Sequence, residues 1–117
     1  MMDKLIEEVE KVILNECERA SINHGTMHNS DHEAYAVTLE ELDEAEEEVQ
    51  ACWSALSKFW EYVKDDNNYL PFRLNSMKLV QEKALLGACE LIQVAAMAYK
   101  AQVTIKDRMF KDKHEGE

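Results

Sequence analysis

The stretch ALLGACELIQVAAMAY, residues 84–99, decides the fold because almost every position is apolar or small, with Glu90 and Gln93 as interruptions. It is too short, and too polar at Glu90, to cross a membrane, so it predicts a buried helix. Burying an unpaired carboxylate costs several kcal/mol, and such groups are rare unless something compensates them. The rest of the sequence must therefore supply what Glu90 faces.

The composition favours a single all-α domain over residues 1–117. The chain has one Pro and three Gly, and 46% of its residues are hydrophobic and 32% charged, which is typical of long helices rather than of a sheet. The net charge of −11 argues against a nucleic-acid backbone or an anionic membrane as partner. It suits a protein that binds cations, or an anion that arrives with its cation.

Apolar periodicity predicts three helices. The first covers about residues 3–20 and ends before Gly25. The second begins after Ser30, a plausible N-cap that Glu33 completes as a capping box, and runs for about 36 residues. The third has Pro71 in its first turn and runs to about residue 106, and the tail from about residue 108 is expected to fray.

The second and third helices are predicted to form an antiparallel hairpin, because the turn within residues 64–71 is short. Counting outward from that turn places Glu90 level with residues 41–48. Residues 31–50 hold nine acidic residues and no Lys or Arg. The two stretches would form a carboxylate cluster that needs a cation, although most charge runs are simply solvated helix faces.

Helical geometry sorts the acidic residues by face. At 100° per residue Glu41 and Glu48 nearly eclipse, with Glu44 one step round from both, and all three flank the apolar stripe. Glu40 and Asp43 point further toward solvent. Acid pairs four residues apart repel, and no basic residue within the stretch relieves them.

Two segments carry a resemblance to a known family. The segments HEAYAVTLEELDEAEEEV, residues 32–49, and ELIQVAAMAYK, residues 90–100, resemble small phage and prophage proteins related to the MazG-like all-α nucleotide pyrophosphohydrolases. That superfamily carries a Glu-Glu-x-x-Glu element on one helix and a Glu-x-x-Asp element on the next. The first element matches at Glu40, Glu41 and Glu44. The second matches at Glu90, while Gln93 stands where the superfamily has Asp.

The resemblance implies a Mg²⁺-dependent enzyme, with Mn²⁺ as an alternative ion, that cleaves a nucleoside triphosphate to a monophosphate and pyrophosphate. The metal ligands would be Glu41, Glu44 and Glu90, with the Gln93 amide as an uncharged fourth. Glu40 or Glu48 would hold a second ion or accept the proton of the attacking water, and Lys100 or Lys83 would meet phosphate. The family assembles as homodimers or homotetramers of helical bundles. Three helices alone cannot cover an apolar hairpin, which also favours an oligomer.

An alternative of a different class is a non-catalytic helical module of phage or prophage origin, whose metal site decayed at Gln93. The aromatic rings of Trp53 and Trp60 would stack on a base in an enzyme, but on a helical stripe they are more often core.

A cytoplasmic location is expected on two grounds. The N-terminal residues are acidic where a signal peptide has its apolar core. The odd number of cysteines, Cys17, Cys52 and Cys89, has no metal-type spacing and indicates buried free thiols in a reducing compartment.

The sequence disfavours two other kinds of metal site. His24, His28 and His32 recur every four residues, which on a helix would make a zinc-binding face. Gly25 and the Ser30 cap are expected to break that helix and leave a polar loop at the mouth of the site. A ferritin-like di-iron centre needs Glu-x-x-His pairs on two helices, and the sequence has none.

Overall fold

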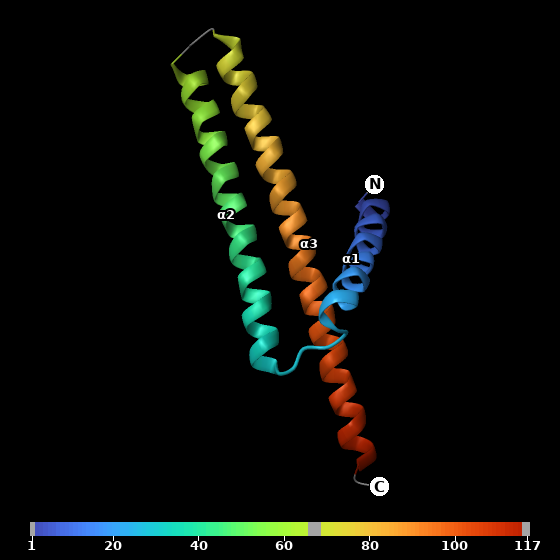
Figure 1. Cartoon of the computed structure of the whole chain (residues 1–117). Coiled ribbons are helices and arrows are strands. Elements are labelled where there is room, and N and C mark those ends of the chain that lie inside the picture. The colour runs from blue at the N-terminus through green and yellow to red at the C-terminus, as the bar shows by residue number, and fades with distance from the viewer. Residues whose placement is uncertain (1, 66–68, 116–117) are drawn as a thin grey trace. The chain divides into compact units, whose positions relative to one another are not determined.

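The protein is all-α in the computed structural model, which describes residues 2–65 and 69–115. The three helices are α1 (Met2–His24), α2 (Asp31–Lys64) and α3 (Leu70–Glu115), and no strand occurs within the described residues (Figure 1). The predicted fold class and the number of helices are therefore confirmed.

The chain divides into two compact units. Unit 1 comprises Met1–Glu41 and Ile92–Glu117, and unit 2 comprises Leu42–Leu91. Both divisions fall inside uninterrupted helices, α2 and α3. Unit 1 thus holds α1, the first turns of α2 and the C-terminal half of α3, whereas unit 2 is a two-helix hairpin.

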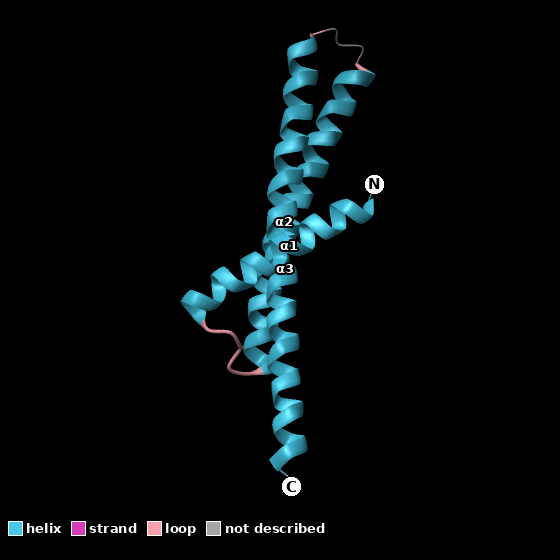
Figure 2. Ribbon diagram, turned by 90° about the vertical axis from the view of Figure 1, so that its right-hand side faces the viewer, coloured by secondary structure: helices cyan, strands magenta, loops and turns pink. Residues whose placement is uncertain are grey.

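Unit 2 confirms the predicted antiparallel pairing, since its parts of α2 and α3 run side by side in opposite directions in both views (Figures 1 and 2). Of the turn predicted within residues 64–71, residues 66–68 lie outside the described residues. The seam is built on small side chains. A Cβ atom added at Gly87 would lie only 3.5 Å from the Glu48 Cβ atom, so the helices approach closely there. Near the turn, the rings of Tyr62 and Phe72 stack at 5.4 Å between centroids.

In unit 1, α1 crosses the C-terminal half of α3 (Figure 2). The thiol of Cys17 donates to the Ala96 carbonyl oxygen over 3.4 Å where the two helices meet. Gly25 ends α1 with φ +83°, a left-handed conformation that glycine adopts freely, and its N–H donates to the Ser21 carbonyl oxygen over 3.0 Å.

The predicted start of α2 is confirmed in its main feature. The backbone N–H of Glu33 donates to Ser30 Oγ over 3.1 Å, so Ser30 is the N-cap. The Glu33 carboxylate accepts a hydrogen bond from the Asn29 side-chain amide at 2.9 Å, a contact that the capping-box pattern did not predict. At the other end of the chain, α3 continues to Glu115, beyond the predicted end near residue 106.

The prediction that residues 84–99 form a buried helix was right about the helix and wrong about the burial. The fully covered apolar side chains of the described residues are Ala45, Ala55 and Ala96. Leu85 is 63% exposed, and Trp53 and Trp60 on α2 are 63% and 56% exposed. The reason is geometric: a two-helix hairpin has one seam, and a helix that is apolar on several sides can cover only one of them against a single neighbour. The free thiols were likewise predicted to be buried, but Cys17 and Cys52 are half-buried and Cys89 is exposed.

Helix α3 also exceeds the length inferred from its most apolar segment. Residues Leu70–Lys113 are long and apolar enough, by length and composition, to cross a membrane, and 17% of their most apolar stretch is buried. The stretch 84–99 is only the middle of this longer helix, so the length of that stretch alone did not decide whether α3 is long enough to span a membrane. Core helices of soluble proteins meet the same criterion.

Candidate carboxylate site

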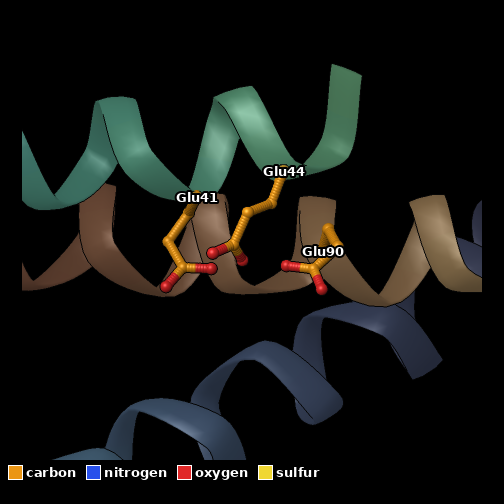
Figure 3. Close-up of side chains that lie close together, drawn as sticks. All are labelled: Glu41, Glu44 and Glu90. Atoms are coloured by element: carbon orange, nitrogen blue, oxygen red, sulfur yellow. The ribbon is translucent and has the colours of Figure 1, made fainter. Parts of the chain in front are cut away.

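Glu44 on α2 and Glu90 on α3 place two carboxylates close together in the hairpin of unit 2. Glu41 precedes Glu44 by one helical turn on the uninterrupted helix α2, as the last residue of this part of unit 1. One oxygen from each of the three carboxylates lies within 4.8 Å of the others, and Figure 3 shows all three side chains converging. The predicted grouping of these three residues is present in the structure.

The spacing suits one divalent cation. Oxygen ligands lie about 2.1 Å from Mg²⁺ and about 2.4 Å from Ca²⁺, so two ligands on opposite sides of an ion are about 4–5 Å apart. Carboxylate oxygens within 4.8 Å of one another need only small side-chain rotations to share an ion. Glu41 and Glu90 are half-buried and Glu44 is exposed, so the group is open to an incoming ligand. The expected full burial of Glu90 is not observed.

Gln93 makes a different contact from the predicted one. Its amide Nε2 donates to Glu16 Oε1 over 2.7 Å, which ties α1 to α3 inside unit 1. The Arg19 guanidinium also binds the Glu16 carboxylate. Hydrogen bonds from Arg19 and, second, from Gln93 lower the pKa of Glu16 to about 2, against an opposing contribution from burial. Gln93 thus serves the docking of α1.

Glu48 and Lys83 form an ion pair in unit 2, with Lys83 Nζ 3.7 Å from Glu48 Oε2. Both side chains are partly covered, at 26% and 29% exposure. Among the described residues, Glu48 does not belong to the ligand group of Glu41, Glu44 and Glu90. Glu40, the other candidate proton acceptor, is exposed on α2.

A polar pocket of about 490 Å³ lies within unit 1. Its lining includes Lys100, the second predicted phosphate contact, and Glu41 from the carboxylate group. Arg19, His24 and Glu33 contribute further charged or titratable groups. Sequence reasoning missed this pocket, because it depends on how α1 and the loop after it fold back onto α3.

The three histidines do not share a helix, as predicted. His24 ends α1, His28 lies in the following loop and His32 lies in the first turn of α2. The sequence predicted a polar loop here but did not indicate that His28 is buried, with a side chain that is 1% exposed. Its backbone N–H donates to Thr104 Oγ1 over 3.0 Å and its Nε2 lies 3.3 Å from the Met97 carbonyl oxygen, so α3 anchors the loop.

The comparisons with known proteins returned nothing: no family model, no curated protein and no solved structure matches the chain. The resemblance to MazG-like enzymes therefore stays a prediction from the two segments that carry it.

Proposed function

We propose that this protein is a Mg²⁺-dependent nucleoside triphosphate pyrophosphohydrolase, with Mn²⁺ as an alternative ion. The observation that carries the proposal is the convergence of Glu41, Glu44 and Glu90, whose carboxylate oxygens lie within 4.8 Å of one another. Three carboxylates would leave positions on Mg²⁺ for phosphate oxygens and water, which is how this ion is commonly held with nucleotides.

Glu41, Glu44 and Glu90 would hold the ion, which would supply positive charge to the phosphates of the substrate. A water molecule would attack the α-phosphorus in line with the departing pyrophosphate. The products are a nucleoside monophosphate and pyrophosphate. The role of the protein is to hold the ion and to orient the phosphates around it.

The surrounding contacts favour one member of each pair of auxiliary residues. Glu40 suits the role of proton acceptor better than Glu48, because Glu48 pairs with Lys83. Lys100 suits phosphate better than Lys83 for the same reason, and it lines a pocket with Glu41. Gln93 is left out of the proposed ligand set, because its hydrogen bond to Glu16 directs its side chain toward α1.

The proposal includes self-association as a homodimer or homotetramer. Large apolar side chains on the hairpin of unit 2, such as Trp53 and Leu85, are more than half exposed. A second copy that packed its own hairpin against this face would complete a four-helix bundle and cover them. With a net charge of −11, the oligomer would work in the cytoplasm without nucleic acid or membrane as a partner.

One observation favours the alternative, a non-catalytic helical module of phage or prophage type. Gln93 brings no charge to a metal, and its hydrogen bond to Glu16 gives it a purely structural purpose. A chain that had lost the fourth carboxylate and kept the helical scaffold would have this arrangement.

Release of pyrophosphate separates the two functions. The full-length protein is incubated with each of the common ribo- and deoxyribonucleoside triphosphates, in Mg²⁺, in Mn²⁺ and in a chelator. Metal-dependent formation of pyrophosphate and the matching monophosphate is expected for at least one substrate. No turnover of any nucleotide with either ion would favour the non-catalytic module.

A further inference from the structure

The pocket of unit 1 has a buried hydrogen-bonding group that the proposed chemistry does not use. His28 lines this pocket together with Glu33, Val37 and Met97. The His28 side chain is 1% exposed, and within the described residues its Nδ1 has no hydrogen-bond partner. A buried polar atom without a partner is unfavourable, so this nitrogen marks a place where a ligand would gain by binding.

The contacts of His28 define what Nδ1 offers. Its Nε2 lies 3.3 Å from the Met97 carbonyl oxygen. Because a carbonyl oxygen only accepts, this contact assigns a proton to Nε2, and in the neutral ring Nδ1 then carries the lone pair. The nearest carboxylate oxygen, Glu33 Oε1, is 3.9 Å away, which is too far for a hydrogen bond.

Nδ1 and the Glu33 carboxylate are therefore two acceptors side by side. The Glu33 side chain is 38% exposed, so a small rotation can open Nδ1 to the pocket while the carboxylate stays beside it. The matching ligand has two adjacent donors on one edge. Among nucleic-acid bases guanine has such an edge, with its N1–H and 2-amino group, whereas adenine and cytosine present one donor beside an acceptor.

We propose that this pocket binds the base of the nucleotide substrate, and that His28 Nδ1 and the Glu33 carboxylate select guanine. The inference rests on the proposed function for the identity of the ligand as a nucleotide. Lys100 in the same pocket carries the opposite charge to the phosphates.

The two hydroxyl groups of ribose are another adjacent donor pair, but their position fits less well. Glu33 lies eight residues before Glu41 on α2, a rise of about 12 Å. If Glu41 holds the metal and its phosphates, the ribose lies close to Glu41 and the base lies at the far end of the nucleotide. The acceptors are at that far end.

Nucleoside monophosphates test the inference without catalysis. Titration calorimetry of the full-length protein, in a chelator, compares GMP with IMP, which lacks the 2-amino group, with AMP, and with dGMP, which lacks one ribose hydroxyl. GMP is expected to bind about tenfold more tightly than IMP, and more tightly still than AMP, while dGMP equals GMP. Equal affinities for GMP, IMP and AMP would overturn the inference, and so would a loss of affinity confined to dGMP, which would assign the donors to ribose.

The variant Glu33→Gln keeps the shape of the side chain and its acceptor for Asn29, and is expected to abolish the preference for GMP over IMP. Asp43→Asn makes the same acid-to-amide change on an exposed position of α2 and is expected to leave the preference intact. In ¹⁵N spectra of the imidazole rings, GMP is expected to shift His28 Nδ1 and not Nε2. An unchanged Nδ1 signal in the presence of bound GMP would also overturn the inference.

Failure of the proposed function looks different from failure of this inference. A protein that binds GMP selectively but releases no pyrophosphate would retain the guanine pocket and lose the enzymatic role. A protein that releases pyrophosphate equally from all nucleotides would retain the role and lose the guanine pocket.

Discussion

Each of the two units of this protein is stabilised by a different kind of contact. Unit 2 is a hairpin sealed by small side chains, with its large apolar groups on the outside. Unit 1 is held by specific polar contacts that link distant parts of the sequence: Gln93 with Glu16, His28 with Met97 and Thr104, and Arg108 with Asp31. Unit 2 carries two of the three carboxylates, Glu44 and Glu90, and an exposed apolar surface, whereas unit 1 carries Glu41 and a polar pocket.

Loss of a metal ligand is expected to have the largest effect. Glu44→Gln removes one of the two unit 2 carboxylates and is predicted to lower metal-dependent pyrophosphate release by about 10²–10³-fold, because the charge on the ion's ligand set falls. Asp43→Asn, one position away on α2, is predicted to retain the activity. Steady-state rates and calorimetric Mg²⁺ titrations of both variants make the measurement. Equal loss in the two would indicate a diffuse acidic surface.

A charge on the outer face of the hairpin is expected to break self-association. Leu85→Glu on α3 is predicted to destabilise the oligomer by about 2–4 kcal/mol, since the carboxylate would be buried without a partner between copies. Ile22→Glu at the end of α1, which is 80% exposed, is the matched control in unit 1 and is predicted to be nearly neutral. Light scattering after gel filtration measures the mass. A wild-type species of 13.5 kDa would contradict the expected oligomer.

Helical periodicity was sufficient to predict unit 2. The apolar stripe and the position of Pro71 predicted where α2 and α3 lie, and counting from the turn placed Glu90 beside Glu44, as observed. In an antiparallel hairpin, two residues that are equally many positions from the turn lie at the same level along the helices. Counting residues from the turn therefore predicts which side chains meet across the hairpin.

The same rules could not predict unit 1. The contact between Gln93 and Glu16 joins residues 77 positions apart, and it depends on how the loop around Gly25 directs α1. Because its motif resembled a metal-binding element, Gln93 was predicted to be a metal ligand. In the structure, its amide donates a hydrogen bond to the Glu16 carboxylate on α1. Glu16 and Arg19, three residues apart, read in the sequence as an ordinary solvated pair on a helix. His28 gave no signal of burial, because its partners are a carbonyl oxygen and a threonine hydroxyl on α3.

Gln93→Asp tests whether residue 93 serves the docking of α1 in unit 1 or the binding of a metal. A carboxylate at position 93 would replace the amide donor of Glu16 and repel it, so unit 1 is predicted to lose about 1–3 kcal/mol of stability at neutral pH. Metal affinity is predicted to stay within about threefold of wild type, a small change of under 1 kcal/mol. Thermal unfolding and Mg²⁺ titration make the two measurements. Tighter metal binding with no loss of stability would return Gln93 to the metal site.

The smallest expected effect is the acid sensitivity of the contact that docks α1. The hydrogen bonds from Arg19 and Gln93 lower the folded-state pKa of Glu16 from 4.5 to about 2. A depressed carboxyl pKa means that the unfolded chain binds more protons than the folded chain between these two values. The stabilisation is therefore complete above about pH 4.5 and is lost as the pH falls toward about 2.

Arg19 is 65% exposed, so solvent screening keeps the contribution of its contact with Glu16 to stability small. Glu16→Gln keeps an acceptor oxygen but cannot ionise, and its free energy of unfolding is predicted to fall less than that of wild type between pH 4.5 and pH 2. Urea unfolding at a series of pH values measures the difference, and Arg19→Gln is predicted to reduce it by about half because the first of the two donors is lost. If the wild type and Glu16→Gln lost stability in parallel over this range, the Glu16 carboxylate would not be the group that couples α1 docking to pH. The acid sensitivity would then belong to other carboxylates, and the polar docking of unit 1 would contribute no more to stability than an ordinary surface ion pair.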